Sequence, residues 1–145
     1  MKFLGHPIHT MLVHFPTALL PMDVVLSYVG YKSHDSSFAY AAYYCMVGGV
    51  ASGYLAMITG LVDLVGIKEN KPALGGGLIH GFINGTAILI YTIFVYKQWK
   101  MPIISEAALS TIIIKAFVVL LLLIGNYFGG QLIFKHRVGV DTNKI

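Results

Sequence analysis

Histidines near the amino terminus are the residues of this chain best suited to chemistry. His6, His9 and His14 fall within nine residues, where the first long apolar run begins, and His80 and His136 follow later. A neutral imidazole ring binds a metal ion or a haem iron through its unprotonated nitrogen. The histidines therefore predict a ligand site, provided that the fold brings several of them together.

The composition indicates a membrane protein. Hydrophobic residues make up 57% of the 145 residues and charged residues only 11%, whereas a soluble domain carries about 25% charged residues. The mean hydropathy is +0.75. The excess of Lys and Arg (10) over Asp and Glu (6) is typical of charges that flank membrane spans, and no basic patch with interleaved aromatic residues favours nucleic-acid binding. We expect one domain, residues 1–145, in contact with the lipid bilayer and not with nucleic acid.

Four apolar runs are each long enough to cross a hydrocarbon core of about 30 Å as a helix. Short polar connections join them, which favours an all-α integral membrane four-helix bundle with up-down-up-down topology and both termini on the same side. The expected helices cover residues 7–31, 38–66, 72–98 and 105–134. Pro16 and Pro21 are expected to bend the first helix. Ser105, a capping residue, and Glu106, an acid in the first turn, are expected to open the fourth.

The alternating direction of the helices predicts where the histidines lie. The amino ends of the first and third helices share a membrane face with the carboxyl ends of the second and fourth. Five of the six histidines and one aspartate belong to that face, and only His34 belongs to the other. The residues of this face are His6, His9, His14, Asp63, His80 and His136.

A haem between diagonal helices is the first interpretation of this face. His14 and His80 each lie about five residues inside their apolar runs, or ~7–9 Å deep, on the first and third helices. These helices stand diagonally opposite in a sequential bundle, farther apart than the about 8–10 Å of neighbours, which leaves room for a porphyrin between two axial imidazoles. His14 and His80 are therefore the predicted axial ligands of one haem b, and His9 with His136 is the reserve pair.

Small and polar residues of the third helix accompany His80. Gly77, Gly81 and Gly85 recur every four residues and leave a flat strip of helix surface without side chains beside the histidine. Such a strip is also typical of helix packing in membranes. Asn84 lies one turn after His80 on the same face, so it is expected to orient the histidine or a bound group. These residues complete the predicted cofactor-binding set.

Two other interpretations use the same residues. His6 and His9, three positions apart on a helix, can chelate one transition-metal ion. Its remaining ligands would come from His14, His80, His136 or Asp63. Alternatively, the histidines are partly hydrated groups at the membrane interface that bind no ligand. The chain would then be a structural subunit of a membrane complex with no cofactor. A stand-alone enzyme is disfavoured, because no Ser or Cys stands beside a histidine as a nucleophile.

Motifs in all four expected helices point to one family. They are His6-Pro7-Ile8-His9, Leu12-Val13-His14-Phe15-Pro16, Gly60-Leu61-Val62-Asp63, His80 with Asn84, and Gly129-Gly130-Gln131-Leu132-Ile133-Phe134-Lys135-His136 with Val138-Gly139-Val140. With these motifs the chain resembles, over almost its whole length, the four-helix membrane family catalogued as domain of unknown function 2231. Two positions depart from the family pattern: Thr10, where proline is frequent, and Arg137, where glycine is frequent. The second departure, at Arg137, is expected to change the orientation of the neighbouring His136.

The resemblance implies a redox function. The family is similar to the two-haem cytochrome b group, and relatives occur joined to cytochrome c or Rieske modules. This chain lacks histidines on its second face, so the resemblance implies at most a one-haem version. We therefore expect an electron-transfer or accessory subunit of a larger respiratory or photosynthetic complex, with other membrane redox subunits or a second copy as partners. The expected location is a prokaryotic inner membrane, and the positive-inside rule places the histidines and both termini at the cytoplasmic side.

Two charges lie deep in the apolar runs, away from the histidines. Asp23 is about eight residues, or ~12 Å, from the end of the first helix, and Lys115 is about ten residues past the start of the fourth. Both distances are measured from the same membrane face, and the two helices are neighbours in a sequential bundle. The sequence therefore predicts an ion pair between Asp23 and Lys115, because pairing offsets part of the cost of each buried charge.

Overall fold

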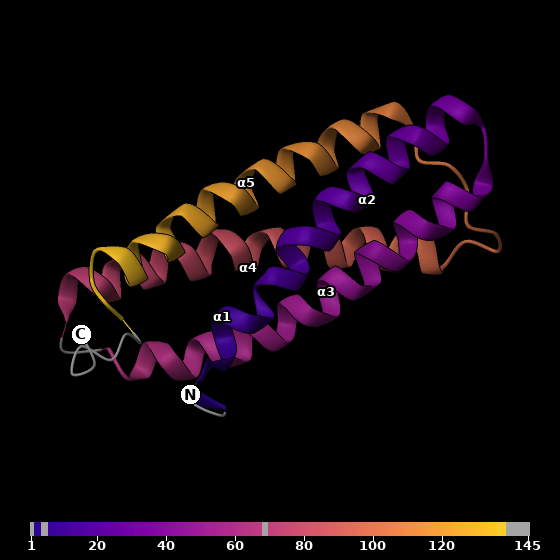
Figure 1. Cartoon of the computed structure of the whole chain (residues 1–145). Helices are drawn as coiled ribbons and strands as arrows, with labels where there is room; N and C mark the ends of the chain where they lie inside the picture. The colour runs from indigo at the N-terminus through magenta and orange to yellow at the C-terminus, as the bar shows by residue number, and fades with distance from the viewer. Residues whose placement is uncertain (1, 4–5, 68–69, 139–145) are drawn as a thin grey trace.

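The computed structural model describes residues 2–3, 6–67 and 70–138, with side chains described from Ile8 onward within these ranges. In this part of the chain a short antiparallel strand pair precedes five helices (Figure 1). The strands are β1 (Lys2–Phe3) and β2 (His6–Pro7). The helices are α1 (Ile8–Leu12), α2 (His14–Ser33), α3 (Ser36–Val65), α4 (Lys71–Trp99) and α5 (Leu109–Phe134).

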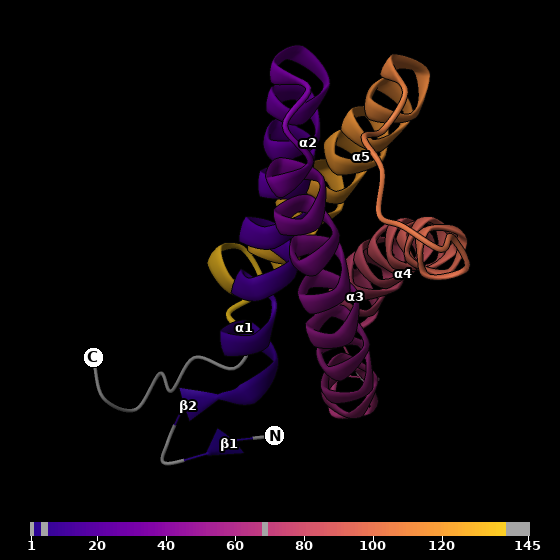
Figure 2. The same ribbon diagram turned by 90° about the vertical axis from the view of Figure 1, so that its right-hand side faces the viewer.

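The long helices α2 to α5 form the predicted up-down-up-down bundle. Both α2 and α4 pack against α3 and α5, so α2 and α4 stand diagonally opposite. The start of α1, the end of α3, the start of α4 and the end of α5 all lie at one end of the bundle (Figure 1). Figure 2 shows α1 and the strand pair at the margin of the bundle at this end. The shared end places the predicted histidine face as the sequence implies.

Four segments are long and apolar enough to cross a membrane. They are Ile8–Ser33, which combines α1 and α2, followed by α3, α4 and α5 as bounded above. Large apolar side chains such as Phe82, Phe117 and Phe134 are exposed on the outside of the bundle. Such exposure is expected of helices that face lipid, because acyl chains are as apolar as the side chains themselves. The integral membrane four-helix bundle is therefore confirmed.

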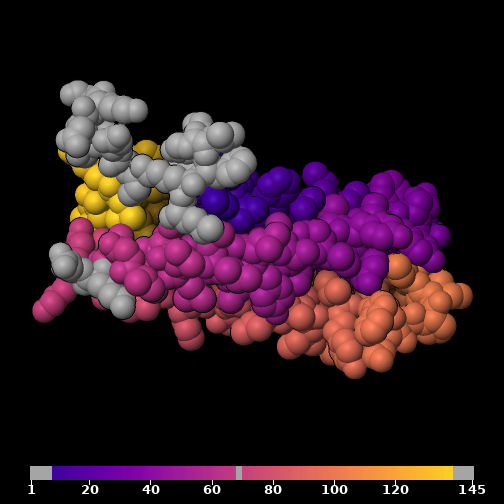
Figure 3. Space-filling view, turned by 90° about the horizontal axis from the view of Figure 1, so that it is seen from below, coloured from indigo at the N-terminus to yellow at the C-terminus, as the bar shows by residue number. Residues whose placement is uncertain are grey.

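The first apolar run forms two helices, separated at Val13, where one bent helix is expected. Pro16 explains the position of the break, because its ring lacks an N–H and clashes with the carbonyl of Leu12, four residues earlier. The chain still turns through the break, since Val13 N–H donates to the carbonyl of His9 (3.1 Å). Pro21 lies inside α2 without dividing it. Helix α1 lies against α3 (Figure 3).

The last helix begins at Leu109, later than the expected start at Ser105. Contacts with other elements hold the connection before it in a non-helical conformation. The Ser105 carbonyl accepts a hydrogen bond from Gln98 Nε2 (3.1 Å), and Glu106 lies 3.2 Å from His34 in the α2–α3 connection. Ser105 and Glu106 therefore join the ends of other helices and do not cap α5.

The amino ends of α3 and α4 carry the side-chain caps that α5 lacks. Asp35 accepts a hydrogen bond from Ser37 N–H (2.9 Å), and Asn70 accepts one from Ala73 N–H (3.2 Å). Hydrogen bonds from Ser37 hold the pKa of the Asp35 carboxyl below its usual range, because they stabilise the ionised form. Both caps begin helices directly after short connections, which keeps successive helices antiparallel.

The core lies at the middle of the bundle and separates its two ends. It is built from Leu20 on α2, Met46 and Val50 on α3, Ala87, Ile88 and Tyr91 on α4, and Val118, Val119 and Leu122 on α5. A Cβ added to Gly49 would collide with the Leu20 side chain, and one added to Gly53 would collide with Ile88. These two glycines therefore let α3 approach α2 and α4 closely.

Candidate ligand site

Two histidines from different elements meet at the end of the bundle where α1 begins. The rings of His9 on α1 and His80 on α4 have centroids 5.9 Å apart and planes at 86° to each other. Both side chains are half-buried. The site thus joins an element at the margin of the bundle to the helix diagonally opposite α2.

His9 is held by α3. Its Nδ1 lies 2.9 Å from the carbonyl oxygen of Ala56. Because a carbonyl only accepts hydrogen bonds, Nδ1 carries the proton, and Nε2 keeps its lone pair in the neutral ring. A Cβ at Gly60, one turn further on, would lie 2.8 Å from His9 Cε1. The absence of a side chain at Gly60 makes the space that the imidazole occupies.

His80 is held by α5 in the same way. Its Nδ1 lies 2.8 Å from the carbonyl oxygen of Gly125, so this ring also has its proton on Nδ1 and its lone pair on Nε2. A Cβ at Gly129 would lie 2.7 Å from His80 Nδ1 and Cε1. Fixing one ring nitrogen by a backbone carbonyl is the usual way in which proteins orient a histidine that binds a metal.

A chain of polar side chains extends from His80 to α2. Asn84 Nδ2 lies 3.0 Å from His80 Nδ1, which does not accept a hydrogen bond because it carries the proton donated to Gly125. Asn84 Nδ2 donates instead to Asn126 Oδ1 (3.1 Å). Asn126 Nδ2 in turn donates to Thr17 Oγ1 (2.9 Å), whose hydroxyl donates to the carbonyl of Val13 (2.7 Å). This network, composed of Asn84, Asn126 and Thr17, connects α4, α5 and α2 directly beneath the histidine pair.

The glycines of α4 differ from one another in their surroundings. A Cβ at Gly77 would lie 2.7 Å from Leu64 on α3, and one at Gly85 would lie 3.7 Å from Met57, also on α3. Gly77 is therefore a position of close helix packing, whereas a side chain at Gly85 would make an ordinary van der Waals contact. Gly81 lies between them, beside His80, and a Cβ there would meet no atom within 4 Å. The surface of α4 next to His80 thus has no neighbouring atoms at Gly81, whereas other side chains lie near it at Gly77 and Gly85.

The expected partner of His80 is replaced by another histidine. His14 is exposed at the start of α2, and its Nδ1 lies 2.6 Å from the Thr10 carbonyl of the preceding turn. The sequence-based pairing of His14 with His80 matched their depths in the membrane and did not compare helix faces. His9 and His14 are five residues apart, so at about 3.6 residues per turn they lie on different faces, and the face of His9 is the one against His80.

The remaining predicted ligands are His136, Asp63 and His6. His136 follows α5 and is half-buried, but the described residues show no hydrogen bond or ring contact between it and the pair, so the reserve pairing of His9 with His136 is not formed. Asp63 is half-buried near the end of α3, and the side chain of His6 lies outside the described residues. No group of three His, Cys, Asp or Glu that could hold a metal ion occurs in the described part of the chain.

Several residues of the site were not singled out from the sequence. Asn126 and Thr17 are polar residues in apolar runs, and such residues inside membrane helices are usually functional or paired, which was the available signal. Gly125 and Gly129 recur at a four-residue spacing on α5, as Gly77 and Gly81 do on α4. The need for a glycine at these positions comes from His80 and Asn84 on another helix, so spacing alone does not reveal it.

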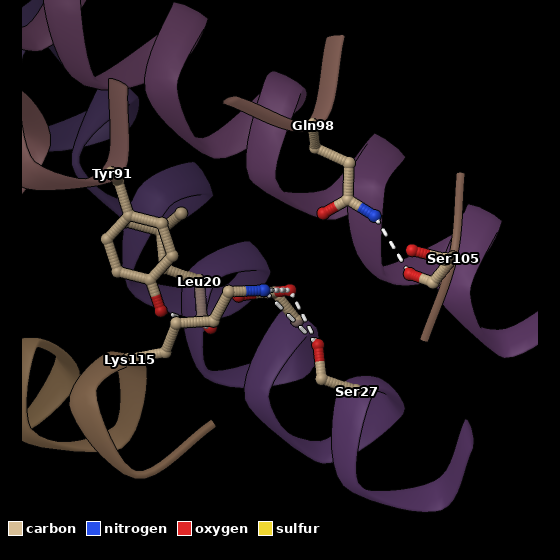
Figure 4. A network of polar contacts seen from close by, with 7 residues as sticks. Leu20, Ser27, Tyr91, Gln98, Ser105 and Lys115 are labelled. Atoms are coloured by element: carbon tan, nitrogen blue, oxygen red, sulfur yellow. Dashed lines mark hydrogen bonds and ion pairs between the residues drawn. The ribbon is translucent and has the colours of Figure 1, made fainter. Parts of the chain in front are cut away.

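A second polar centre lies on the other side of the core. Lys115 Nζ is 2.9 Å from Asp23 Oδ1 and 3.3 Å from Ser27 Oγ, and Ser27 donates to the same aspartate oxygen (3.1 Å). The Asp23 side chain is fully buried, and that of Lys115 is 2% exposed. Figure 4 shows Lys115 reaching toward Ser27, with Tyr91 nearby. The predicted ion pair between Asp23 and Lys115 is confirmed.

Comparison with known proteins identifies a family but no characterised relative. The model of a family described as a predicted membrane protein (DUF2231) matches residues 5–142, which is nearly the whole chain. No curated protein and no solved structure matches the chain.

Proposed function

The chain belongs to the DUF2231 family of predicted membrane proteins, and from this premise and the histidine pair we propose that it is a membrane-embedded haem b subunit. His9 and His80 are the proposed axial ligands. Bound haem supplies reversible one-electron chemistry at its iron. The observation that carries the proposal is the close approach of two half-buried imidazoles, each with its Nδ1 proton directed at a backbone carbonyl.

The number of donors favours haem over a bare metal ion. A protein site for a lone transition-metal ion commonly needs three or four side-chain ligands, whereas haem iron already has four porphyrin nitrogens and needs two. Only two suitable side chains meet among the described residues. The ring centroids of His9 and His80 are 5.9 Å apart, so these two side chains would hold the group together.

The surroundings of the pair also fit a bound group. Asn84 Oδ1 is buried and has no hydrogen-bond partner among the described residues, although the rest of its amide is bonded. A buried polar atom without a partner is costly, and a ligand or a water commonly satisfies it. Beside it, the open strip at Gly81 lets a flat group approach α4. Asn84 therefore has the position of a residue that orients the ligand or His80.

Two protein ligands on one iron favour electron transfer over catalysis. His9 and His80 would both bind the iron of a bound haem, so neither a substrate nor dioxygen would bind to it. The remaining task of the chain is to hold the iron, exclude water and tune the potential through the hydrogen bonds at Nδ1. Such a subunit needs a donor and an acceptor of electrons. We therefore propose that it contacts another membrane redox subunit or a second copy.

Haem retention by three matched histidine variants tests the assignment. His9→Ala and His80→Ala are expected to lose most of the haem, because each removes one of the two ligands. His14→Ala is the control, since this histidine is exposed and belongs to the same apolar run. Full haem retention by both His9→Ala and His80→Ala, or equal loss in His14→Ala, would contradict the proposed ligands.

If the wild-type protein is colourless, its metal content distinguishes a metal-ion site from a purely structural role. If it retains a stoichiometric transition metal that His80→Ala loses, the site binds an ion and not haem. If it retains neither, the hydrogen bonds of His9 to Ala56 and of His80 to Gly125 serve to join helices. Element analysis of protein purified without chelators distinguishes these two outcomes.

A further inference from the structure

The Asp23–Lys115 pair has hydrogen-bonding capacity that its neighbours do not use. An ammonium group has three donors, and Lys115 directs two of them at Asp23 Oδ1 and Ser27 Oγ. Asp23 Oδ2 is buried and has no hydrogen-bond partner among the described residues. A fully buried carboxylate oxygen without a partner is expensive, so the site has a place for one more polar group.

A small pocket connects this pair to one end of the bundle. Its lining includes Lys115 and Ser27, which both donate to Asp23. Gln98, Ser105 and Glu106 also line it. Its volume, about 10 Å³, corresponds to roughly one water molecule. Glu106 reaches the surface, with 28% of its side chain exposed, and it pairs there with the exposed His34. In Figure 4 the Gln98–Ser105 hydrogen bond lies beside the ion pair, on the side of Ser27.

An apolar layer separates the Asp23–Lys115 pair from the histidine end of the bundle. On α2, Leu20 lies between Thr17 of the histidine network and Asp23, and it is fully buried. On α4, Ile88 lies between Asn84 and Tyr91 in the same way. Leu122 on α5 lies between Asn126 and Lys115. These three core residues, Leu20, Ile88 and Leu122, belong to one packed cluster and separate the two polar centres.

We propose that Asp23, paired with Lys115, is a proton-binding site that exchanges protons with water only at the Glu106 face of the bundle. A proton enters from bulk water at Glu106 and crosses the pocket through a water molecule to the Ser27 hydroxyl, which lines the pocket and donates to Asp23. Ser27 passes its own proton to the carboxylate, converting it to the acid, and takes up the incoming proton. Release follows the same path in reverse, with no other bond formed or broken. The site is distinct from the histidine pair and does not depend on haem.

Groups from every neighbouring helix face the aspartate. Lys115 on α5 donates to it, and the Tyr91 hydroxyl on α4 faces it while donating to the Leu20 carbonyl (3.4 Å). Cys45 on α3 is close enough to interact electrostatically with it. The positive charge of Lys115, 2.9 Å away, favours the charged form of the carboxylate, whereas a fully buried position favours the neutral form. Opposed influences of this kind are what a group needs if it is to gain and lose a proton.

Cysteine accessibility tests the one-sided path with a matched pair of variants. Ala42 lines the pocket and Ala87 does not, yet both are buried alanines, at 3% and 1% exposure. In a Cys45→Ser background, Ala42→Cys should react roughly tenfold or more faster than Ala87→Cys with a small charged thiol reagent, because such reagents attack thiolates that water reaches. This difference should appear only when the reagent is added at the Glu106 face of sealed vesicles. Equal rates from that face, or faster reaction from the histidine face, would overturn the proposal.

Infrared difference spectroscopy tests proton binding itself. An acid step at the Glu106 face should produce the band of a protonated carboxyl group, and the double variant Asp23→Asn/Lys115→Met should lack it. This double variant removes both charges together and so leaves neither unpaired in the core. The same acid step at the histidine face should produce no such band on the same timescale. An Asp23-dependent band from both faces, or from neither, would contradict a one-sided proton site.

Discussion

At the scale of single residues, backbone carbonyls decide what the two histidines can bind. Ala56 and Gly125 each accept the Nδ1 proton of one ring, so both rings keep the lone pair on Nε2. The same arrangement requires space, which Gly60 gives to His9 and Gly129 gives to His80. The chemistry of the pair therefore depends on two backbone carbonyls and on the space that glycines leave.

A methyl group at Gly129 should disturb His80. In Gly129→Ala the new Cβ would lie 2.7 Å from two atoms of the ring, so the ring must shift away from Gly125. We expect a loss of about 1–3 kcal/mol in the free energy of unfolding, as for overpacked positions, together with weaker haem retention. Thermal unfolding and haem content measure both effects.

Gly130→Ala is the matched control for this variant. It lies next to Gly129 on α5, and a Cβ there would meet nothing within 4 Å. Alanine is favoured over glycine in a helix by about 0.5–1 kcal/mol, so Gly130→Ala should leave stability unchanged or increase it. Equal destabilisation by the two variants would show that the contact with His80 is not the cause.

At the scale of elements, the bundle is held by a few polar links between helices that otherwise pack through apolar side chains. The Asp23–Lys115 pair links α2 to α5, and the network of Asn84, Asn126 and Thr17 links α4, α5 and α2. The His34–Glu106 pair links two connections at the surface. These links differ in burial, and burial decides how much each contributes.

Removing one partner of the buried pair should be far more harmful than removing both. Asp23→Asn leaves the Lys115 ammonium unpaired in the core, and breaking a buried pair in this way costs about 3–5 kcal/mol. Adding Lys115→Met should restore a large part of that stability, since no unpaired charge then remains. A double-mutant cycle measured by unfolding in detergent tests this coupling. Strictly additive costs would mean that the two residues do not interact energetically.

The surface pair should behave differently. His34 is exposed over 81% of its side chain, and Glu106 over 28%. Exposed ion pairs contribute about 0.2–1 kcal/mol, so His34→Ala should change the free energy of unfolding by no more than that. The effect should also diminish at high salt, because solvent ions screen exposed charges. A salt-independent loss of several kcal/mol would contradict this assignment.

The break in the first apolar run should control the position of His9. Pro16→Ala restores an N–H that can donate to the Leu12 carbonyl, so α1 and α2 are expected to merge into one continuous helix. The merged helix should carry His9 away from Ala56, and haem retention should fall although His9 and His80 are both present. Pro21→Ala is the control, because Pro21 lies inside α2 without dividing it. Equal haem content in the two variants would show that the break does not position the ligand.

At the scale of the whole molecule, the two polar centres occupy opposite halves of one bundle, separated by an apolar core. The histidine pair lies at the end where α1 begins, and the Asp23–Lys115 pair opens toward the connections that hold His34 and Glu106. Leu20, which lies between them, is fully buried. This division suits a membrane protein in which electrons and protons are handled on different sides.

The sequence predicts the bundle well because its signals are additive over long segments. Apolar runs identify the four spans, and counting helical rise places Asp23 level with Lys115. Counting fails at His14, because the rise per residue gives the depth of a side chain and not the helix face on which it lies. It fails again at Ser105 and Glu106, whose contacts with Gln98 and His34 come from distant parts of the chain. Such contacts exist only once the helices are assembled.

The most direct test of the central claim is the absorption spectrum of the wild-type protein, purified from membranes in mild detergent and recorded oxidised and then reduced. Haem bound by two imidazoles gives, on reduction, an α-band at the position of b-type cytochromes, with about one haem per chain. That band should be much weaker in His80→Ala and unchanged in His14→Ala. A wild-type protein with no such band in either redox state, after expression with sufficient haem, would contradict the assignment of His9 and His80 as haem ligands.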